Sequence, residues 1–166
     1  MANTYTLIAS TAISSSVASY SFNSIPATYT DLKLVGSIRT DRAGNEDYIN
    51  ITFNGATTSQ NAIMVVGAGS YSASYSTTNN WTFIADSPIF TVNTFTNFEV
   101  YIPNYASSNN KSFSVDSAAE NNATTAYDVL SAGLWANSAA INSVKIQGVG
   151  NLVQYSTLYL YGIKNS

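Results

Sequence analysis

Cysteine and histidine are both absent from this sequence. Without cysteine the chain can form neither a disulfide nor a thiolate metal site. The absence of histidine excludes Ser-His-Asp triads, Cys-His pairs, zinc sites with histidine ligands and any histidine general base. These two absences remove the commonest hydrolytic and metal-dependent mechanisms.

Charged residues are scarce as well. They make up only 9% of the chain, against about 25% in an average soluble domain. Six Lys and Arg are spread along a chain with a formal net charge of −3, so no basic stripe is present to bind the phosphates of a nucleic acid. We therefore expect no nucleic-acid partner.

Long apolar runs and targeting signals are missing too. The longest apolar run, residues 62–68, is far shorter than the roughly 20 residues of a membrane-spanning helix. The N-terminus has neither the basic region nor the apolar region of a secretory signal. We therefore expect a protein that is made in a cytoplasm, is not secreted and does not enter a membrane.

The composition still suffices for a folded domain. With 45% hydrophobic and 13% aromatic residues, the 166-residue chain can build one core without disulfides or metals. Its surface must consist largely of Ser, Thr, Asn, Gly and Tyr. Such a surface suits contact with copies of the chain or with sugars, although a merely neutral surface would have the same composition.

Apolar and polar residues alternate along much of the chain, which is the period of a half-buried strand. The clearest example is residues 98–102, after which Pro103 removes a backbone donor and residues 104–110 have the composition of a turn. The alternation starts again at Phe113. Strand, polar turn and strand is the unit that recurs.

About eight to ten short strands are expected in total. Residues 126–135 fit a helical face as well as alternation, but Gly133 and the Thr-rich residues before it favour a strand. Gly36, on an apolar strand face, indicates a bulge or a close neighbour. The other predicted strands are residues 4–10, 13–22, 32–39, 49–53, 62–66, 81–84, 88–92, 141–149 and 152–163.

These strands predict an all-β fold: a single-domain antiparallel β-sandwich over residues 1–166, jelly-roll-like. Residues 67–87 have little pattern and are expected to contain an exposed, variable loop region or an irregular hairpin. The last strand is apolar on both faces, which suits a central position in a sheet or cover by a neighbouring subunit. We expect it to pair with the N-terminal strand.

The only acidic cluster is the turn at residues 41–47. Asp41, Asn45 and Asp47 are candidate oxygen ligands for a cation such as calcium, although the spacing is not that of an EF-hand. A solvated loop with local ion pairs to Arg39 and Arg42 is the alternative. We expect no cofactor.

Catalytic residues are not indicated. Two carboxylates for glycoside hydrolysis would need to face each other across a cleft, and the nine acidic residues show no signature of such a pair. No Ser lies in a G-x-S-x-G elbow. We expect this protein not to be an enzyme.

Aromatic side chains are the better candidates for function. Tyr71, Tyr75 and Trp81 flank the polar loop region and are candidates for stacking on sugars. Aromatic residues more often fill a core or a subunit contact, because each must bury a large area. Tyr155, Tyr159 and Tyr161 are accordingly candidates for a subunit interface.

Several stretches resemble a group of small proteins encoded by tailed bacteriophages, many with marine hosts. The resemblance lies in residues 24–44, 101–127, 132–141 and 151–166, and the run YIPNY…SFSVDS…ENNATTAY within 101–127 is its most specific part. Members of this group are usually described as virion structural, capsid decoration or tail-associated proteins. The group defines no catalytic residues.

The resemblance implies a virion structural protein. Its partners would be copies of itself, as a homo-oligomer and preferentially a trimer, and other virion proteins such as a major capsid protein. The alternative is a carbohydrate-binding adhesin domain of a phage tail or fibre, with the region 67–87 contacting a host-surface glycan. Enzymatic activity is a distant third.

Overall fold

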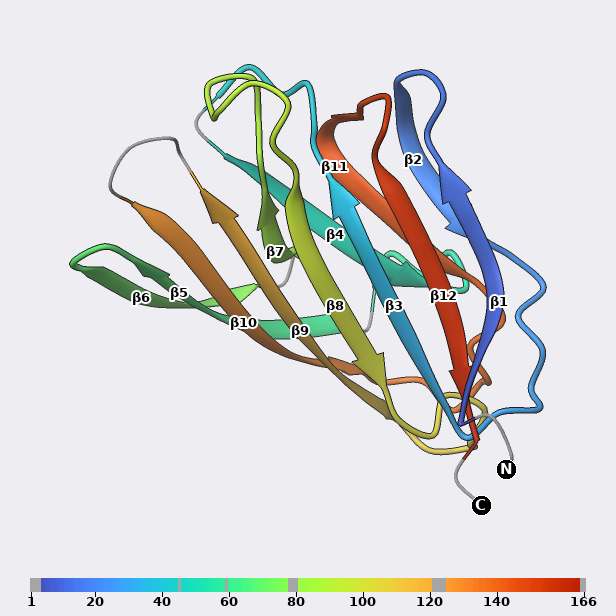
Figure 1. The fold of residues 1–166 in the computed structure, drawn as a ribbon. Coiled ribbons are helices and arrows are strands. Elements are labelled where there is room, and N and C mark those ends of the chain that lie inside the picture. The colour runs from blue at the N-terminus through green and yellow to red at the C-terminus, as the bar shows by residue number, and fades with distance from the viewer. Residues whose placement is uncertain (1–3, 45, 59, 78–80, 121–124, 165–166) are drawn as a thin grey trace.

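The computed structural model describes residues 4–44, 46–58, 60–77, 81–120 and 125–164, and it shows two antiparallel sheets packed face to face (Figure 1). The larger sheet has eight strands in the order β1-β12-β3-β8-β9-β10-β5-β6, and the smaller has four in the order β2-β11-β4-β7. The strands are β1 (Tyr5–Ala12), β2 (Val17–Phe22), β3 (Asp31–Ile38), β4 (Asp47–Phe53), β5 (Gln60–Ala68), β6 (Tyr71–Thr77), β7 (Trp81–Ala85), β8 (Thr96–Ile102), β9 (Lys111–Glu120), β10 (Ala126–Trp135), β11 (Val144–Leu152) and β12 (Thr157–Ile163).

The predicted all-β antiparallel sandwich is confirmed, and residues 126–135 are a strand. The jelly-roll form stays a prediction, since a jelly roll has eight strands and this chain divides twelve strands into eight and four.

The core lies between the two sheets and is built by alternation. Every second residue of β9 is buried, and β8 follows the same pattern before it ends in front of Pro103. Aromatic rings join the sheets: Phe83 of the smaller sheet stacks on Phe98 of the larger one with 4.5 Å between ring centroids. The alternation of apolar and polar residues in the sequence therefore identifies correctly the residues that face the core between the two sheets.

The first and last strands are joined in one ladder. β1 pairs with β12 in antiparallel register, from Tyr5 opposite Ile163 to Ala12 opposite Thr157. On its other edge β12 pairs with β3, so it lies inside the larger sheet. Both expectations for the last strand, a central position and pairing with the N-terminal strand, are confirmed.

Some predicted elements are wrong. Residues 88–92 form turns between β7 and β8, where the carbonyl groups of Phe90 and Thr91 accept hydrogen bonds from the buried Arg39 side chain and not from a neighbouring strand. Within 67–87, residues 71–77 form β6, which pairs with β5 as a hairpin, one of the two forms expected there. The strand predicted over residues 81–84 is confirmed as the largely buried β7. In β6, Tyr71, Ala73 and Tyr75 alternate with serines, but the strand is exposed at the sheet edge and lacks the aliphatic residues of the buried strands. Residues 152–163 belong to two strands separated by a turn, and β11 begins at Val144.

Gly36 has the close neighbours that its place in the sequence indicates. A Cβ at this position would lie 2.6 Å from the Phe98 ring and 2.6 Å from the Thr157 carbonyl oxygen. We expect Gly36→Ala to lower the free energy of unfolding by about 1–3 kcal/mol in urea denaturation, because the packed strands must move apart. The matched change Gly67→Ala, with 4.0 Å to the nearest oxygen, should leave stability nearly unchanged. Equal losses in the two variants would contradict this account.

Candidate functional site

Loops gather at one end of the sandwich, opposite the two chain termini. Figure 1 shows there the connections β1–β2, β3–β4, β7–β8 and β11–β12. Three segments make up the part that we call the loop end: residues 39–44, 86–95 and 148–156. Their positions follow from the antiparallel strands that they connect.

Backbone hydrogen bonds tie the three segments of the loop end together. The Thr40 amide donates to the Asp86 carbonyl at 2.9 Å, and the Asp41 amide donates to the Asn151 carbonyl at 3.0 Å. Segment 39–44 thus lies between the other two and is bonded to both. Main-chain groups that are paired in this way resist local opening.

A buried guanidinium fixes the segment 86–95. Arg39 is only 9% exposed, and its Nη1 donates to the carbonyls of Thr91 at 2.7 Å and Thr94 at 2.9 Å. Its Nη2 donates to the Ser87 carbonyl at 2.8 Å. The planar fork of an arginine has the geometry for several such bonds at once. The turns between β7 and β8 are therefore fixed by the buried Arg39 side chain.

Two carboxylates fix the segment 148–156 in a similar way. The fully buried Asp47 accepts hydrogen bonds from the amides of Val149 at 3.0 Å and Gly150 at 2.9 Å. Asp41 accepts from the Asn151 amide at 2.7 Å and from its side-chain nitrogen at 2.9 Å. The hydrogen bond from the Asn151 side chain is the main cause that lowers the pKa of Asp41.

These contacts give the acidic turn a structural role. The oxygens of Asp41 and Asp47 receive N–H donors, and the Arg42 guanidinium lies 3.7 Å from Asp47. Of the three candidate calcium ligands, Asn45 lies outside the described residues. In the described part of the chain no three acidic side chains come together as metal ligands. Of the alternative, a solvated loop with ion pairs to both arginines, the described residues show only the contact of Arg42 with Asp47, which is itself buried, while Arg39 binds carbonyl groups of the segment 86–95.

The loop end exposes apolar side chains. Ile89, Val92, Val149 and Tyr155 are 62–74% exposed, more than any other large hydrophobic side chain of the described residues. All four lie on segments that buried charged groups hold in place. Apolar side chains on a rigid support lose little entropy when a partner covers them.

The three tyrosines proposed as a subunit interface do not form one row. Tyr155 lies at the loop end, in the turn between β11 and β12, with a φ of 73°. Tyr159 and Tyr161 lie on β12 and face outward from the larger sheet, opposite Val35 and Lys33 of β3. The structure brings Tyr159 and Tyr161 together and separates Tyr155 from them.

The three aromatic residues proposed as glycan contacts lie in two aromatic pairs, because Trp81 pairs with a fourth residue, Tyr48. Tyr71 and Tyr75 on β6 are 53% and 42% exposed, and their hydroxyl oxygens are hydrogen-bonded at 2.5 Å. Trp81 on β7 stacks on Tyr48 of β4, with ring centroids 4.6 Å apart and planes 15° apart. We call these four residues the aromatic corner. Tyr48 is the member that the sequence analysis did not single out.

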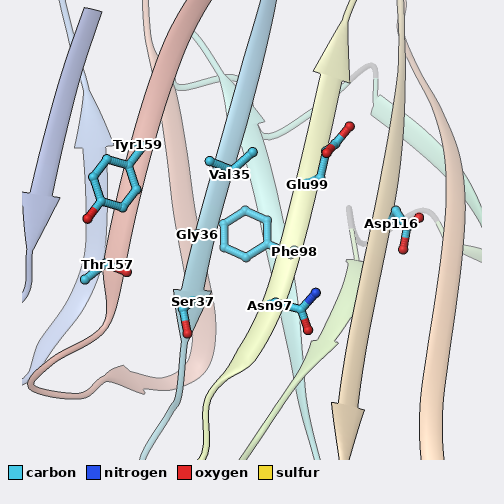
Figure 2. Close-up of a pocket in the computed structure, with 9 residues that line it drawn as sticks. All are labelled: Val35, Gly36, Ser37, Asn97, Phe98, Glu99, Asp116, Thr157 and Tyr159. Atoms are coloured by element: carbon cyan, nitrogen blue, oxygen red, sulfur yellow. The ribbon is translucent and has the colours of Figure 1, made fainter. Parts of the chain in front are cut away.

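A shallow hollow of about 490 Å³ lies on the outer face of the larger sheet. Figure 2 shows Tyr159, Val35, Glu99 and Asp116 side by side on four neighbouring strands. Glu99 and Asp116 are directly opposite each other, and Glu99 also forms an ion pair with Lys33 at 2.7 Å. The pair lies on an open sheet surface, without the walls that hold a sugar between two catalytic acids.

Comparison with known protein families, curated proteins and solved structures finds no match to this chain. The resemblance to phage proteins therefore stays a prediction. Among the described residues there is no helix of the length and hydrophobicity that crossing a membrane requires.

Proposed function

We propose that this chain is a structural protein of a bacteriophage virion. Its most suitable place is outside the capsid, as a decoration or accessory protein that stabilises the particle through contacts with its own copies, preferentially in trimers, and with a major capsid protein. The protein acts by burying surface, and the proposal gives it no catalytic step.

The observation that carries this proposal is the rigid, apolar loop end. Val92 is 74% exposed and Tyr155 is 72% exposed, on segments whose carbonyls and amides are bound to Arg39, Asp41 and Asp47. Exposed apolar groups that gather in one place are typical of contact surfaces. The fixed backbone favours binding because little order has to be created on contact.

The low charge of the chain supports the same proposal. Only 9% of the residues are charged, and the formal net charge is −3. Copies that pack side by side on a shell therefore repel one another weakly. The resemblance in residues 101–127 and in the other similar stretches supports a phage particle as the place of this protein.

Self-association can be tested with the purified protein. We expect sedimentation velocity at about 50 µM to show an oligomer, because micromolar affinity suffices at that concentration. The double change Val92→Ser and Tyr155→Ser removes two exposed apolar groups of the loop end and should yield the monomer. Since both side chains are largely exposed, circular dichroism and the melting temperature should stay those of the unchanged chain.

The change Tyr159→Ser serves as the control, since this tyrosine lies on the outer sheet face. It should leave the oligomer intact. A monomer for the unchanged protein, or loss of the oligomer in the Tyr159 variant alone, would contradict the role of the loop end. Cryo-electron microscopy of intact particles provides the further test: copies in large numbers on the head support decoration, and a handful at the tail contradicts it.

A further inference from the structure

We propose that the aromatic corner formed by Tyr48, Tyr71, Tyr75 and Trp81 binds a neutral pyranose unit of a glycan. This site is separate from the loop-end residues Val92 and Tyr155, and it does not depend on the assembly proposed above. Each copy of a particle protein would thereby make one weak contact with a sugar-coated surface.

The corner exists because the two sheets differ in width. β6 is the last strand of the eight-stranded sheet, whereas the four-stranded sheet ends at β7. Tyr71 and Tyr75 pair with Ala68 and Met64 of β5, so their side chains lie on the face that carries the buried Met64. Both tyrosines are nevertheless about half exposed. The inner face of β6 therefore extends past the core and is open to a ligand.

The two tyrosines on β6 hold each other in place. They are four residues apart on one strand, and the hydrogen bond between their hydroxyls requires both rings to lean toward each other over Ala73. This contact limits the rotamers of two exposed side chains before any ligand is present. A ring surface that is already ordered stacks on a sugar with a smaller loss of entropy.

The second aromatic pair supplies the neighbouring wall. Tyr48 lies between the buried strand positions Asp47 and Ile49, so it points away from the core. Its ring stacks on Trp81, and the Arg42 guanidinium carbon lies 5.8 Å from its centroid. Its hydroxyl donates to the Glu46 carboxylate at 3.3 Å. This wall thus combines two aromatic rings with a guanidinium and a carboxylate.

The strands that carry the two pairs are close in space: β7, with Trp81, contacts β5, and β5 pairs with β6, which carries Tyr71 and Tyr75. The hydrogen bond with Tyr71 is the main cause that raises the pKa of Tyr75, and the charges of Tyr48 and Glu46 contribute to the rise. Burial is the main cause that raises the pKa of Tyr48, to which Glu46 and Tyr71 add. The β6 pair and the β4–β7 pair therefore lie on the same side of the sandwich, where each sheet has its last strand.

The charges of this surface favour a neutral ligand. The single guanidinium, Arg42, is already bound to the Glu46 carbonyl at 2.9 Å and lies 3.7 Å from the Asp47 carboxylate. No excess positive charge remains among these groups for a phosphate or a uronic acid. The C–H face of a pyranose can stack on an aromatic ring, while its hydroxyls exchange hydrogen bonds with the tyrosine hydroxyls and the Glu46 carboxylate.

Binding can be measured with defined neutral oligosaccharides. Cellohexaose, maltohexaose, mannohexaose and chitohexaose serve as probes, with tryptophan fluorescence and ligand-observed NMR as the readouts. We expect at least one probe to bind with a dissociation constant below about 1 mM, as suits a few stacking contacts. Binding to none of them at about 5 mM would overturn the proposal.

Variants locate the site. Tyr75→Ala should weaken the binding of that probe about tenfold, since it removes one ring and releases the other. Tyr75→Phe keeps the ring and loses the hydroxyl, so its affinity should lie between that of the unchanged chain and that of Tyr75→Ala. Tyr159→Ala, an exposed tyrosine on the opposite face, is the matched control and should bind like the unchanged chain.

Three results would overturn the assignment: equal binding by Tyr75→Ala, loss of binding in Tyr159→Ala, or binding of polygalacturonate in place of every neutral probe. The sedimentation experiment tests different residues, so a failure of the sugar site and a failure of the assembly proposal are distinguishable.

Discussion

Replacing Lys111 with methionine is expected to lower the free energy of unfolding by about 3–5 kcal/mol. Lys111 is 1% exposed. Its ammonium donates to the carbonyls of Ser107 at 2.7 Å, Asn137 at 3.2 Å and Ala139 at 2.6 Å. Methionine keeps most of the volume but offers no donor, so three carbonyl groups lose a partner.

The three contacts also define the protonation state of this lysine. Burial lowers the pKa of Lys111. A neutral amine has only two N–H donors, whereas three carbonyl oxygens lie within bonding distance of Nζ, so the geometry is that of the charged ammonium. The Trp135 ring, 5.7 Å away, adds a favourable interaction with the cation. The lysine thereby joins the turn after β8 to the segment after β10.

Urea denaturation followed by intrinsic fluorescence measures the loss. Lys145→Met is the matched control, because Lys145 lies on β11 and is partly exposed. Its effect should stay within about 0.5 kcal/mol, as for other surface substitutions. A Lys111→Met variant whose stability falls by less than about 1 kcal/mol would show that the three carbonyls find other partners.

Much of this architecture was predictable because half-buried strands have a readable period. In β9 the period even places Lys111 on the buried face, two residues before Phe113. Lys111 lies between the predicted turn, residues 104–110, and the predicted restart of the alternation at Phe113, and its spacing from Phe113 was a usable signal. Two of the three partners of its ammonium come from a segment 26–28 residues away, which no local pattern reveals.

The candidate sites were less predictable, since they depend on strand order. Tyr71, Tyr75 and Trp81 stood out as aromatic residues in a polar region, but Tyr48 joins them only because β4 pairs with β7. Similarly, the apolar residues Ile89 and Val92 indicated a strand, although the structure exposes both in turns. Apolar residues that serve a contact surface imitate the pattern of a core.

Arg39 is the second residue whose loss should have a large effect. We expect Arg39→Met to lower the free energy of unfolding by about 2–4 kcal/mol, since at least three carbonyl groups of the segment 86–95 lose their donor. Lys33→Met is the matched control on the same chain region: its ion pair with Glu99 is partly exposed and should contribute less than about 1 kcal/mol.

A second substitution at the same position, Arg39→Lys, should have a local effect that is more informative than the loss of overall stability. Arg39→Lys retains the charge, but a single ammonium cannot reach Ser87 on one side and the pair Thr91 and Thr94 on the other, as the two arms of the guanidinium do. Hydrogen exchange should therefore accelerate in residues 87–95 while the amides of β8 and β9 stay protected.

If the fixed shape of the loop end is what makes it a contact surface, this variant should also associate more weakly in sedimentation velocity, although Ile89 and Val92 are unchanged. Association of undiminished strength, measured together with accelerated exchange, would mean that the apolar side chains suffice without their support. The buried arginine would then stabilise the fold without shaping the contact. Because the same protein sample gives both measurements, they separate the contribution of preorganisation from that of apolar area.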